Sequence, residues 1–274
     1  MLLIAMVSIQ LGASLAKSLF PVLGPAGATA MRLVLATLIL LAIYRPWRGA
    51  SLYGSRRALL IYGAALGFMN LTFYLALERV PMGIVVAIEF LGPLGVAVAA
   101  SRRLIDFAWV GLAVIGLLLM LPLTPQAQPI DPVGIVYALL AGTGWALYII
   151  YGTRAGAEHG GRSVALGMVV ATAVVLPFGV LEAGSSLLLS SVLPVALAVA
   201  VLSSALPYSL EMYALTRVPT RTFGIFMSIE PALAAIAGLI VLGETLTPLQ
   251  WLAIGCVMLA SVGSAGSSAT RDCP

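Results

Sequence analysis

The sequence is poor in charge, histidine and cysteine. Only 9% of its 274 residues are charged, against roughly 25% in soluble domains, which excludes a fold with a fully solvated surface. One histidine and two cysteines are too few for a disulfide framework or a Cys/His metal cluster. The histidine, His159, stands in a polar loop and leaves a Ser–His hydrolase without a base, and no glycine-rich phosphate loop precedes a helix. We therefore expect a protein that is not an enzyme and that binds no cofactor or metal.

The sequence is instead rich in long apolar runs. Hydrophobic residues make up 61% of the chain, and its mean hydropathy is +1.11. A membrane span takes about 20 mostly apolar residues, and a transmembrane barrel would show an alternation that is absent. Gly63 and Gly67, four residues apart, predict the close approach of one helix to a neighbour. The runs predict an all-α integral membrane protein of ten transmembrane helices, at 1–20, 25–44, 58–77, 82–100, 105–122, 132–152, 163–181, 190–214, 220–241 and 248–267.

Basic residues predict the topology, because Lys and Arg in short loops stay on the cytoplasmic side. If the first helix starts inside, the outer loops hold only Arg79. The inner loops and the tail then hold Arg45, Arg48, Arg56, Arg57, Arg102, Arg103, Arg154, Arg162, Arg217, Arg221 and Arg271. Both termini are therefore predicted to be cytoplasmic, and the net charge of +4 implies no nucleic-acid partner. The first residues lack a basic region and a cleavage site, which predicts a retained helix. Because the chain starts within that helix, we expect a short native leader before it.

One motif recurs about half a chain length later. Leu75–Pro81 is echoed by Tyr213–Pro219, with Pro81 and Pro219 separated by 138 positions. Each copy is followed by an acid and a proline, Glu89 with Pro93 and Glu230 with Pro231. The loop after the first copy is basic and the equivalent loop after the second is acidic, as an inverted duplication requires. The chain is thus predicted to consist of a first five-helix repeat (1–123), an outer linker (124–131), a second five-helix repeat (132–268) and a cytoplasmic tail (269–274).

Four charged residues lie well inside predicted spans. Each costs roughly 2.5–3.5 kcal/mol at a helix centre, so such residues usually face one another or a polar cavity. Two cations and two acids suit a zwitterion, the cations addressing its carboxylate and the acids its ammonium. The acids are also candidate proton carriers. The predicted substrate-binding or proton-coupling residues are Glu230, Glu89, Arg32 and Lys17.

Structural roles stay open for the two cations. Lys17 can extend to the outer interface, and Arg32 can bridge to Glu89. Glu230 is the strongest functional candidate, because it is near mid-bilayer by residue count and beside a proline that frees backbone carbonyls.

Further polar residues are predicted to line the pathway, although interfacial or packing roles are equally open for the tyrosines. Glu211 lies six residues before Arg217, so we expect it near the cytoplasmic mouth, in an ion pair with Arg217 or Arg221. The predicted lining residues are Asn70, Gln10, Tyr74, Tyr148, Tyr208, Tyr213 and Glu211.

Five segments carry a resemblance to a known family. Leu242–Pro248 resembles the loop before the last helix in the drug/metabolite transporter superfamily, whose members have ten helices in two EamA repeats. Gly12–Pro21, Arg154–Gly160, Leu206–Met212 and Leu215–Gly224 resemble the bacterial threonine/homoserine exporters. The resemblance implies export of small neutral amino acids across the bacterial inner membrane, driven by proton antiport. It carries over no residue roles.

Three hypotheses follow. The first is an exporter whose two repeats alternate around a midplane cavity, with a zwitterionic amino acid, protons and lipid as its partners. The second is a transporter of the same superfamily for a lipophilic cation or another metabolite, which a cavity walled by aromatic residues around a lone acid would favour. The third is a membrane scaffold or sensor that transports nothing, in which the buried charges would be locked in ion pairs with no cavity between them.

Overall fold

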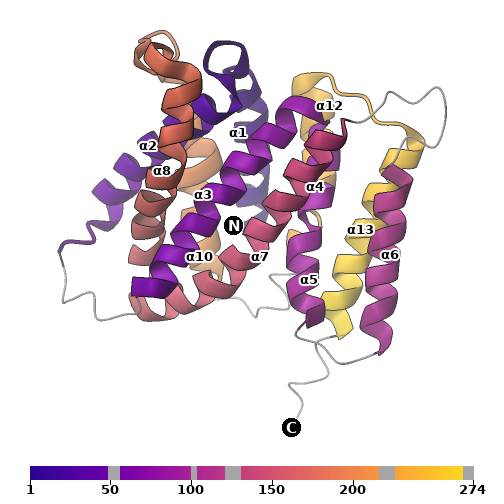
Figure 1. The fold of residues 1–274 in the computed structure, drawn as a ribbon. Helices are drawn as coiled ribbons and strands as arrows, with labels where there is room; N and C mark the ends of the chain where they lie inside the picture. Colours follow the sequence, from indigo (N-terminus) through magenta and orange to yellow (C-terminus); the bar gives the residue numbers. More distant parts are fainter. Residues whose placement is uncertain (49–55, 100–103, 121–130, 216–225, 268–274) are drawn as a thin grey trace.

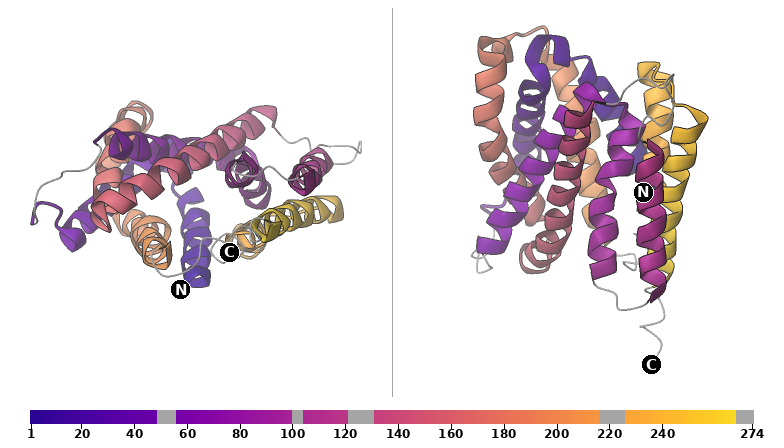
Figure 2. Two further views of the ribbon diagram at one scale, coloured as in Figure 1. Left: turned by 90° about the horizontal axis from the view of Figure 1, so that it is seen from below. Right: turned by 45° about the vertical axis from the view of Figure 1, so that its right-hand side comes forward.

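The computed structural model describes residues 1–48, 56–99, 104–120, 131–215 and 226–267. Over these ranges the chain is helical and contains no β-strand, which confirms the predicted all-α class. The helices run side by side in one bundle (Figure 1). Figure 2 shows the same bundle from below and turned by 45° about the vertical axis.

The helices follow the apolar runs, with some differences at their bounds. The first part of the chain forms α1 (Leu2–Lys17), α2 (Phe20–Tyr44), α3 (Arg56–Arg79), α4 (Met82–Glu89), α5 (Leu91–Ala99) and α6 (Leu104–Met120). The second part forms α7 (Pro132–His159), α8 (Arg162–Ala183), the 3₁₀-helix η1 (Gly184–Leu188), α9 (Leu193–Ala200), the π-helix η2 (Val201–Ala205), α10 (Leu206–Leu215), α12 (Glu230–Leu242) and α13 (Pro248–Ser267). Of the predicted linker 124–131, only Asp131 belongs to the described residues.

Prolines explain the interruption of two predicted helices near the cavity-facing residues Glu89 and Ser203. The predicted helix 82–100 divides into α4 and α5 after Glu89, and the predicted helix 190–214 contains the π-helical turn η2. A proline has no N–H to bond the carbonyl four residues earlier. Pro93 therefore leaves the Glu89 carbonyl without its helical partner, and Pro207 does the same for Ser203. Both breaks place a polar side chain where the backbone is irregular.

Length and composition make several described helices suitable as membrane spans. Five are long and apolar enough to cross a bilayer: Phe20–Tyr44, Arg56–Arg79, Pro132–Glu158, Arg162–Leu188 and Leu193–Glu211. Shorter apolar helices of 10–17 residues are Leu2–Lys17, Met82–Val96, Phe107–Leu119, Glu230–Leu242 and Pro248–Ser264. A chain of this kind is a multi-pass membrane protein.

Helices far apart in sequence pack against each other. α2 lies along α8, α3 along α7 and α8, α6 along α13, and α4 against α12. Small residues permit these contacts: a Cβ added at Gly63 would lie 2.7 Å from the carbonyl oxygen of Gly167, and one at Gly67 would lie 2.8 Å from that of Ala171. The predicted close approach at Gly63 and Gly67 is thereby confirmed, and the neighbour is α8.

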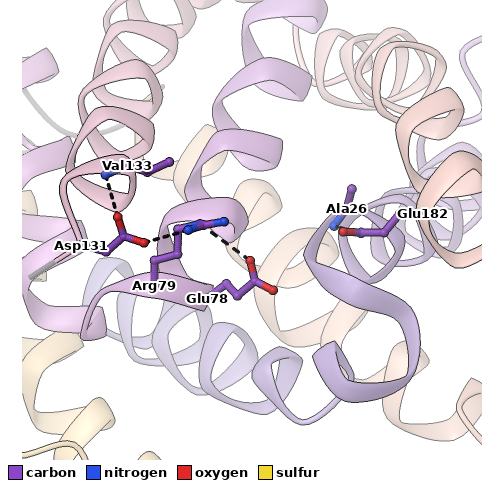
Figure 3. A network of polar contacts seen from close by, with 6 residues as sticks. All are labelled: Ala26, Glu78, Arg79, Asp131, Val133 and Glu182. Atoms are coloured by element: carbon purple, nitrogen blue, oxygen red, sulfur yellow. Dashed lines mark hydrogen bonds and ion pairs between the residues drawn. The ribbon is translucent and has the colours of Figure 1, made fainter.

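Polar contacts tie the helices together at the end of the bundle drawn uppermost in Figure 1. Arg79 at the end of α3 donates to Asp131 at 2.7 Å, and Asp131 accepts from the Val133 N–H at 2.8 Å as the N-cap of α7 (Figure 3). Glu78 lies 3.9 Å from the Arg79 guanidinium. The hydrogen bond from Arg79 lowers the pKa of Asp131 below its ordinary value, so the pair stays ionised through neutral pH and is lost only as acid protonates Asp131.

The start of α2 is kinked and capped by a side chain from another helix. Gly24 has φ 68° and ψ 169°, a left-handed conformation that suits only glycine, and the next residue is Pro25. Beyond this break the N–H groups of Ala26 and Gly27 have no helical partners. Glu182 on α8 accepts from Ala26 at 2.6 Å (Figure 3) and from Gly27 at 3.0 Å. Glu182 therefore caps the N-terminal end of the α2 segment from another helix of the same chain, and it fixes α2 to α8.

Loss of this cap should destabilise the bundle. We expect Glu182→Ala to lower the free energy of unfolding by about 1–2 kcal/mol, the cost of losing an N-cap, because two backbone donors lose their acceptor. The measurement is thermal unfolding of the purified protein. Glu78→Ala, which removes a carboxylate from an exposed ion pair, serves as the control and should change stability by less than about 0.5 kcal/mol. Equal melting temperatures for Glu182→Ala and the wild type would contradict the capping role.

Candidate functional site

A cavity lies inside the bundle, with walls built from helices of both parts of the chain. Counted with the solvent space at its opening, its volume is about 610 Å³. Helices α1, α2, α3, α4, α7, α10 and α12 contribute side chains, as does η2. The lining residues are Ile9, Gln10, Ala13, Arg32, Met69, Asn70, Phe73, Val86, Glu89, Trp145, Tyr148, Ser203, Tyr208, Glu211, Met227 and Glu230.

Polar side chains at the breaks in three helical segments face this cavity. Glu89 ends α4 at the break before Pro93, and Glu230 begins α12 just before Pro231. Ser203 lies in the π-helical turn η2, and such turns are common at functional sites. Proline-induced breaks therefore account for the position of three polar side chains in an otherwise apolar interior.

Arg32 is the cation of the cavity. Its side chain is buried, with the residue only 3% exposed. It donates to Ser203 Oγ at 3.2 Å and to Asn70 Oδ1, and its guanidinium lies 4.5 Å from the centre of the Tyr74 ring. Its Nε has no hydrogen-bond partner, and no carboxylate in the described parts of the chain lies within ion-pair distance. Arg32 is held in place by neutral groups, so its Nε–H donor and its positive charge remain available to bind an anionic group.

Glu230 is held in a complementary way. It is 5% exposed, and its Oε1 accepts from Gln10 Nε2 at 3.1 Å. Its Oε2 is buried without a partner. No cation of the described residues pairs with it.

Two more carboxyl groups face the same space. Glu89 and Glu211 are 6% and 7% exposed and line the cavity. The described residues offer neither of them an ion pair or a hydrogen bond. Glu211 thus lies deeper than its sequence position suggested, while its expected partners Arg217 and Arg221 fall outside the described residues. The three acids are not placed to hold a metal, since the described residues contain no suitable group of three His, Cys, Asp or Glu.

The other residues predicted for the site have different positions. Lys17 does not line the cavity; its Nζ makes an ion pair with Glu244 at 2.7 Å, and Glu244 also accepts from the Met82 N–H at 2.7 Å. Tyr148 and Tyr208 belong to the lining. Tyr74 is fully buried against Arg32, whereas Tyr213 is 45% exposed and lies away from the cavity.

Eight lining residues had no place in the sequence-based prediction, and two of them, Ser203 and Trp145, have side chains that can form hydrogen bonds. Ser203 sits in an apolar run and carries no charge to mark it, although Pro207, four residues later, signals the irregular turn. Trp145 resembles the aromatic residues that pack helices elsewhere, and only the fold shows that it reaches the cavity.

A bundle of membrane-spanning helices that buries ionisable side chains around an internal cavity is the architecture of a membrane transport protein. A model of the EamA-like transporter family matches residues 132–265. The chain is also 58% identical, over 263 residues, to the threonine/homoserine exporter RhtA of Escherichia coli (strain K12), a match that covers 96% of this chain and 89% of the relative. The chain therefore belongs to the EamA-like transporter family, within the drug/metabolite transporter superfamily.

Other relatives agree with this membership. RhtA of Salmonella typhimurium (strain LT2) is 57% identical over 263 residues, again 96% of this chain and 89% of the relative. The uncharacterized inner membrane transporter YedA of Escherichia coli (strain K12) is 29% identical over 226 residues, or 80% of this chain and 71% of YedA. One solved crystal structure, 18% identical, superposes with a TM-score of 0.62 over 98% of this chain and 96% of its own, which shows a shared fold. The protein is a multi-pass transporter of the bacterial inner membrane and not an enzyme.

Proposed function

We propose that this protein exports small neutral amino acids of the threonine and homoserine type, by proton antiport with alternating access. The observation that carries the proposal is one cavity with a buried cation, Arg32, and a buried acid, Glu230, neither of which has an oppositely charged partner among the described residues. The names of the relatives that are 57–58% identical, threonine/homoserine exporters, supply the substrate class.

The cavity can bind both charges of a zwitterion. A substrate carboxylate accepts from the free Nε of Arg32, and the substrate ammonium donates to Glu230, with Glu89 on the neighbouring helix as the alternative acceptor. Arg32 and Glu230 then each meet a counter-charge that the described residues of the empty cavity do not provide. Burial of unpaired charges is costly, and this cost favours a ligand that pairs with both.

Proton coupling follows from the count of charges. Of the described side chains that line the cavity, one is cationic and three are acidic, Glu89, Glu211 and Glu230. Carboxylates at membrane depth are costly when unpaired, so the empty cavity favours carboxyl groups that carry protons. An arriving ammonium competes with a proton for Glu230. Exchange of the two cations on one acid, at opposite faces of the membrane, constitutes antiport.

The architecture supports alternating access between two inverted five-helix repeats, residues 1–123 and 132–268. The described residues hold five long and five shorter apolar helices, ten in all. Equivalent helices of the two parts meet as antiparallel pairs, α4 with α12 and α6 with α13 (Figure 1). Arg45, Arg56 and Arg154 lie at or near helix ends opposite the end that holds Arg79, which favours cytoplasmic termini under the positive-inside rule.

The alternatives have weaker support. A scaffold or sensor would have its buried charges locked in ion pairs, but Lys17 is the predicted charge that has such a partner among the described residues. A transporter of lipophilic cations would place aromatic side chains around a lone acid. Aromatic residues are present, Trp145 and Tyr148 among them, but Arg32 shares the cavity and would repel a cation.

Counterflow in proteoliposomes tests the proposal. Vesicles preloaded with unlabelled threonine should accumulate labelled threonine or homoserine, and an acidic interior should increase that accumulation, because protons leaving the vesicle drive the amino acid in. Leucine serves as the hydrophobic control and should not exchange. Exchange of a lipophilic cation in place of threonine would favour the second hypothesis, and no flux of any probe would favour a scaffold.

A further inference from the structure

Gln10 is a buried polar residue in the middle of α1 whose hydrogen bonding is half complete. The residue is 1% exposed and lines the cavity. Its amide Nε2 donates to Glu230 Oε1 at 3.1 Å, and its Oε1 has no partner. Glu230 Oε2 has no partner either. Two buried acceptor oxygens therefore lie on residues joined to each other by a hydrogen bond.

The orientation of the amide follows from its neighbour. While Glu230 is ionised, rotation of the amide by half a turn would bring Gln10 Oε1 against a carboxylate oxygen, two acceptors with no hydrogen between them. The hydrogen bond to Glu230 thus leaves the carbonyl oxygen of Gln10 for another donor. A buried acceptor without a donor costs about 1–3 kcal/mol, so a ligand that supplies donors here gains affinity.

We propose that Gln10 is a substrate-binding residue, whose Oε1 accepts one N–H of the substrate's primary ammonium while Glu230 Oε2 accepts another. The proposal rests on the amino-acid export proposed above. A primary ammonium has three N–H donors, enough for both oxygens with one to spare. A proton on Glu230 Oε2 supplies one hydrogen, which Gln10 Oε1 can accept, so the amino acid and the proton compete for the same pair of oxygens.

Charge explains why an amide suits this position better than a carboxylate. The cavity already combines three acidic side chains with one cation. A carboxyl group at position 10 would add a fourth acidic group to the cavity, and its negative charge beside that of Glu230 would be costly in a low-dielectric interior. An amide offers an acceptor oxygen without charge, and its N–H group holds the neighbouring carboxylate in position.

The test measures the affinity of the full-length protein, in lipid nanodiscs, for two ligands by isothermal titration calorimetry. The ligands are L-threonine and its N,N-dimethyl derivative, whose single N–H cannot serve both acceptors. Gln10→Met preserves the size of the side chain and removes its acceptor. Ser8→Ala is the matched control, because Ser8 on the same helix donates to the Leu202 carbonyl at 2.6 Å and does not contact Glu230.

We expect Gln10→Met to weaken threonine binding about tenfold, the value of one hydrogen bond to a charged group, and to weaken binding of the dimethyl derivative less than threefold. Ser8→Ala should bind threonine within twofold of the wild type. Unchanged threonine affinity in Gln10→Met overturns the proposal, as does an equal loss for both ligands, which would make Gln10 only a support for Glu230. If none of the proteins binds the derivative, the ratio of the threonine affinities of Gln10→Met and Ser8→Ala decides. A wild type that binds neither threonine nor homoserine would instead refute the proposed function.

Discussion

Replacement of Glu230 by glutamine is expected to lower pH-driven threonine export roughly 100-fold or more while the protein stays folded. Glutamine has the shape of a protonated glutamate, so the packing at the start of α12 is kept. It can neither release a proton nor offer a negative charge to an ammonium. A buried charge that loses its partner costs about 3–5 kcal/mol, and about 1.4 kcal/mol corresponds to tenfold, which sets the size of the expected loss.

The measurement is threonine uptake into proteoliposomes with an acidic interior, with melting temperatures recorded for the same preparations. Glu78→Gln provides the control, since Glu78 is an exposed carboxylate outside the cavity, and should transport like the wild type. Glu89→Gln and Glu211→Gln alter the other two acids of the cavity and should reduce transport less than Glu230→Gln. Wild-type flux in Glu230→Gln would remove this residue from the mechanism.

Charge in an apolar run was enough to locate much of the candidate site. Arg32, Glu89 and Glu230 are each expensive in a bilayer, so their presence at depth predicted a polar interior, and the structure places all three around one cavity. Residue counting gives position along a helix axis. It does not give the direction in which a side chain points, which depends on the rotation of each helix against its neighbours.

That missing rotation explains where sequence and structure differ. Lys17 and Arg32 were both predicted as cations of the site, with extension to the outer interface left open for Lys17. In the structure Lys17 lies at the end of α1 and reaches Glu244. Glu211 was expected beside arginines at the mouth, but the π-helical turn η2 lies in the same helical segment, and Glu211 faces the cavity. Uncharged polar residues such as Gln10 carry no energetic signal strong enough to separate a binding role from a packing role.

Replacement of Arg32 by methionine is expected to have opposite effects on stability and on transport. The guanidinium is buried, has no carboxylate partner among the described residues, and is held by Ser203, Asn70 and the Tyr74 ring. Replacing a buried ion pair with apolar side chains of similar volume is often neutral or stabilising, by about 1–4 kcal/mol, and a buried charge without a counter-charge carries the desolvation cost with no ion pair to offset it. The melting temperature of Arg32→Met should therefore equal or exceed that of the wild type, even though Asn70 Oδ1 loses a donor.

Transport should fall in the same variant by roughly 100-fold, because the substrate carboxylate loses the one cation among the described lining residues and remains buried without a partner. Arg32→Lys restores the charge but not the planar group that reaches Ser203 and Asn70 together, so an intermediate loss of about tenfold is expected. An analogue that lacks the carboxylate, 1-amino-2-propanol, should bind Arg32→Met at least as well as it binds the wild type.

The two readouts separate a binding role from a structural one. If Arg32 mainly stabilises the bundle, for example as a partner of Glu89 in another state of the transport cycle, methionine should lower the melting temperature, and affinity for the analogue should fall together with that for threonine. If Arg32 binds the carboxylate, stability is retained and only ligands with a carboxylate lose affinity. The deciding quantity is the ratio of the affinity for threonine to that for 1-amino-2-propanol, measured in the wild type and in Arg32→Met. General damage to the cavity would lower both affinities and leave that ratio unchanged, whereas loss of a carboxylate-binding group lowers the ratio.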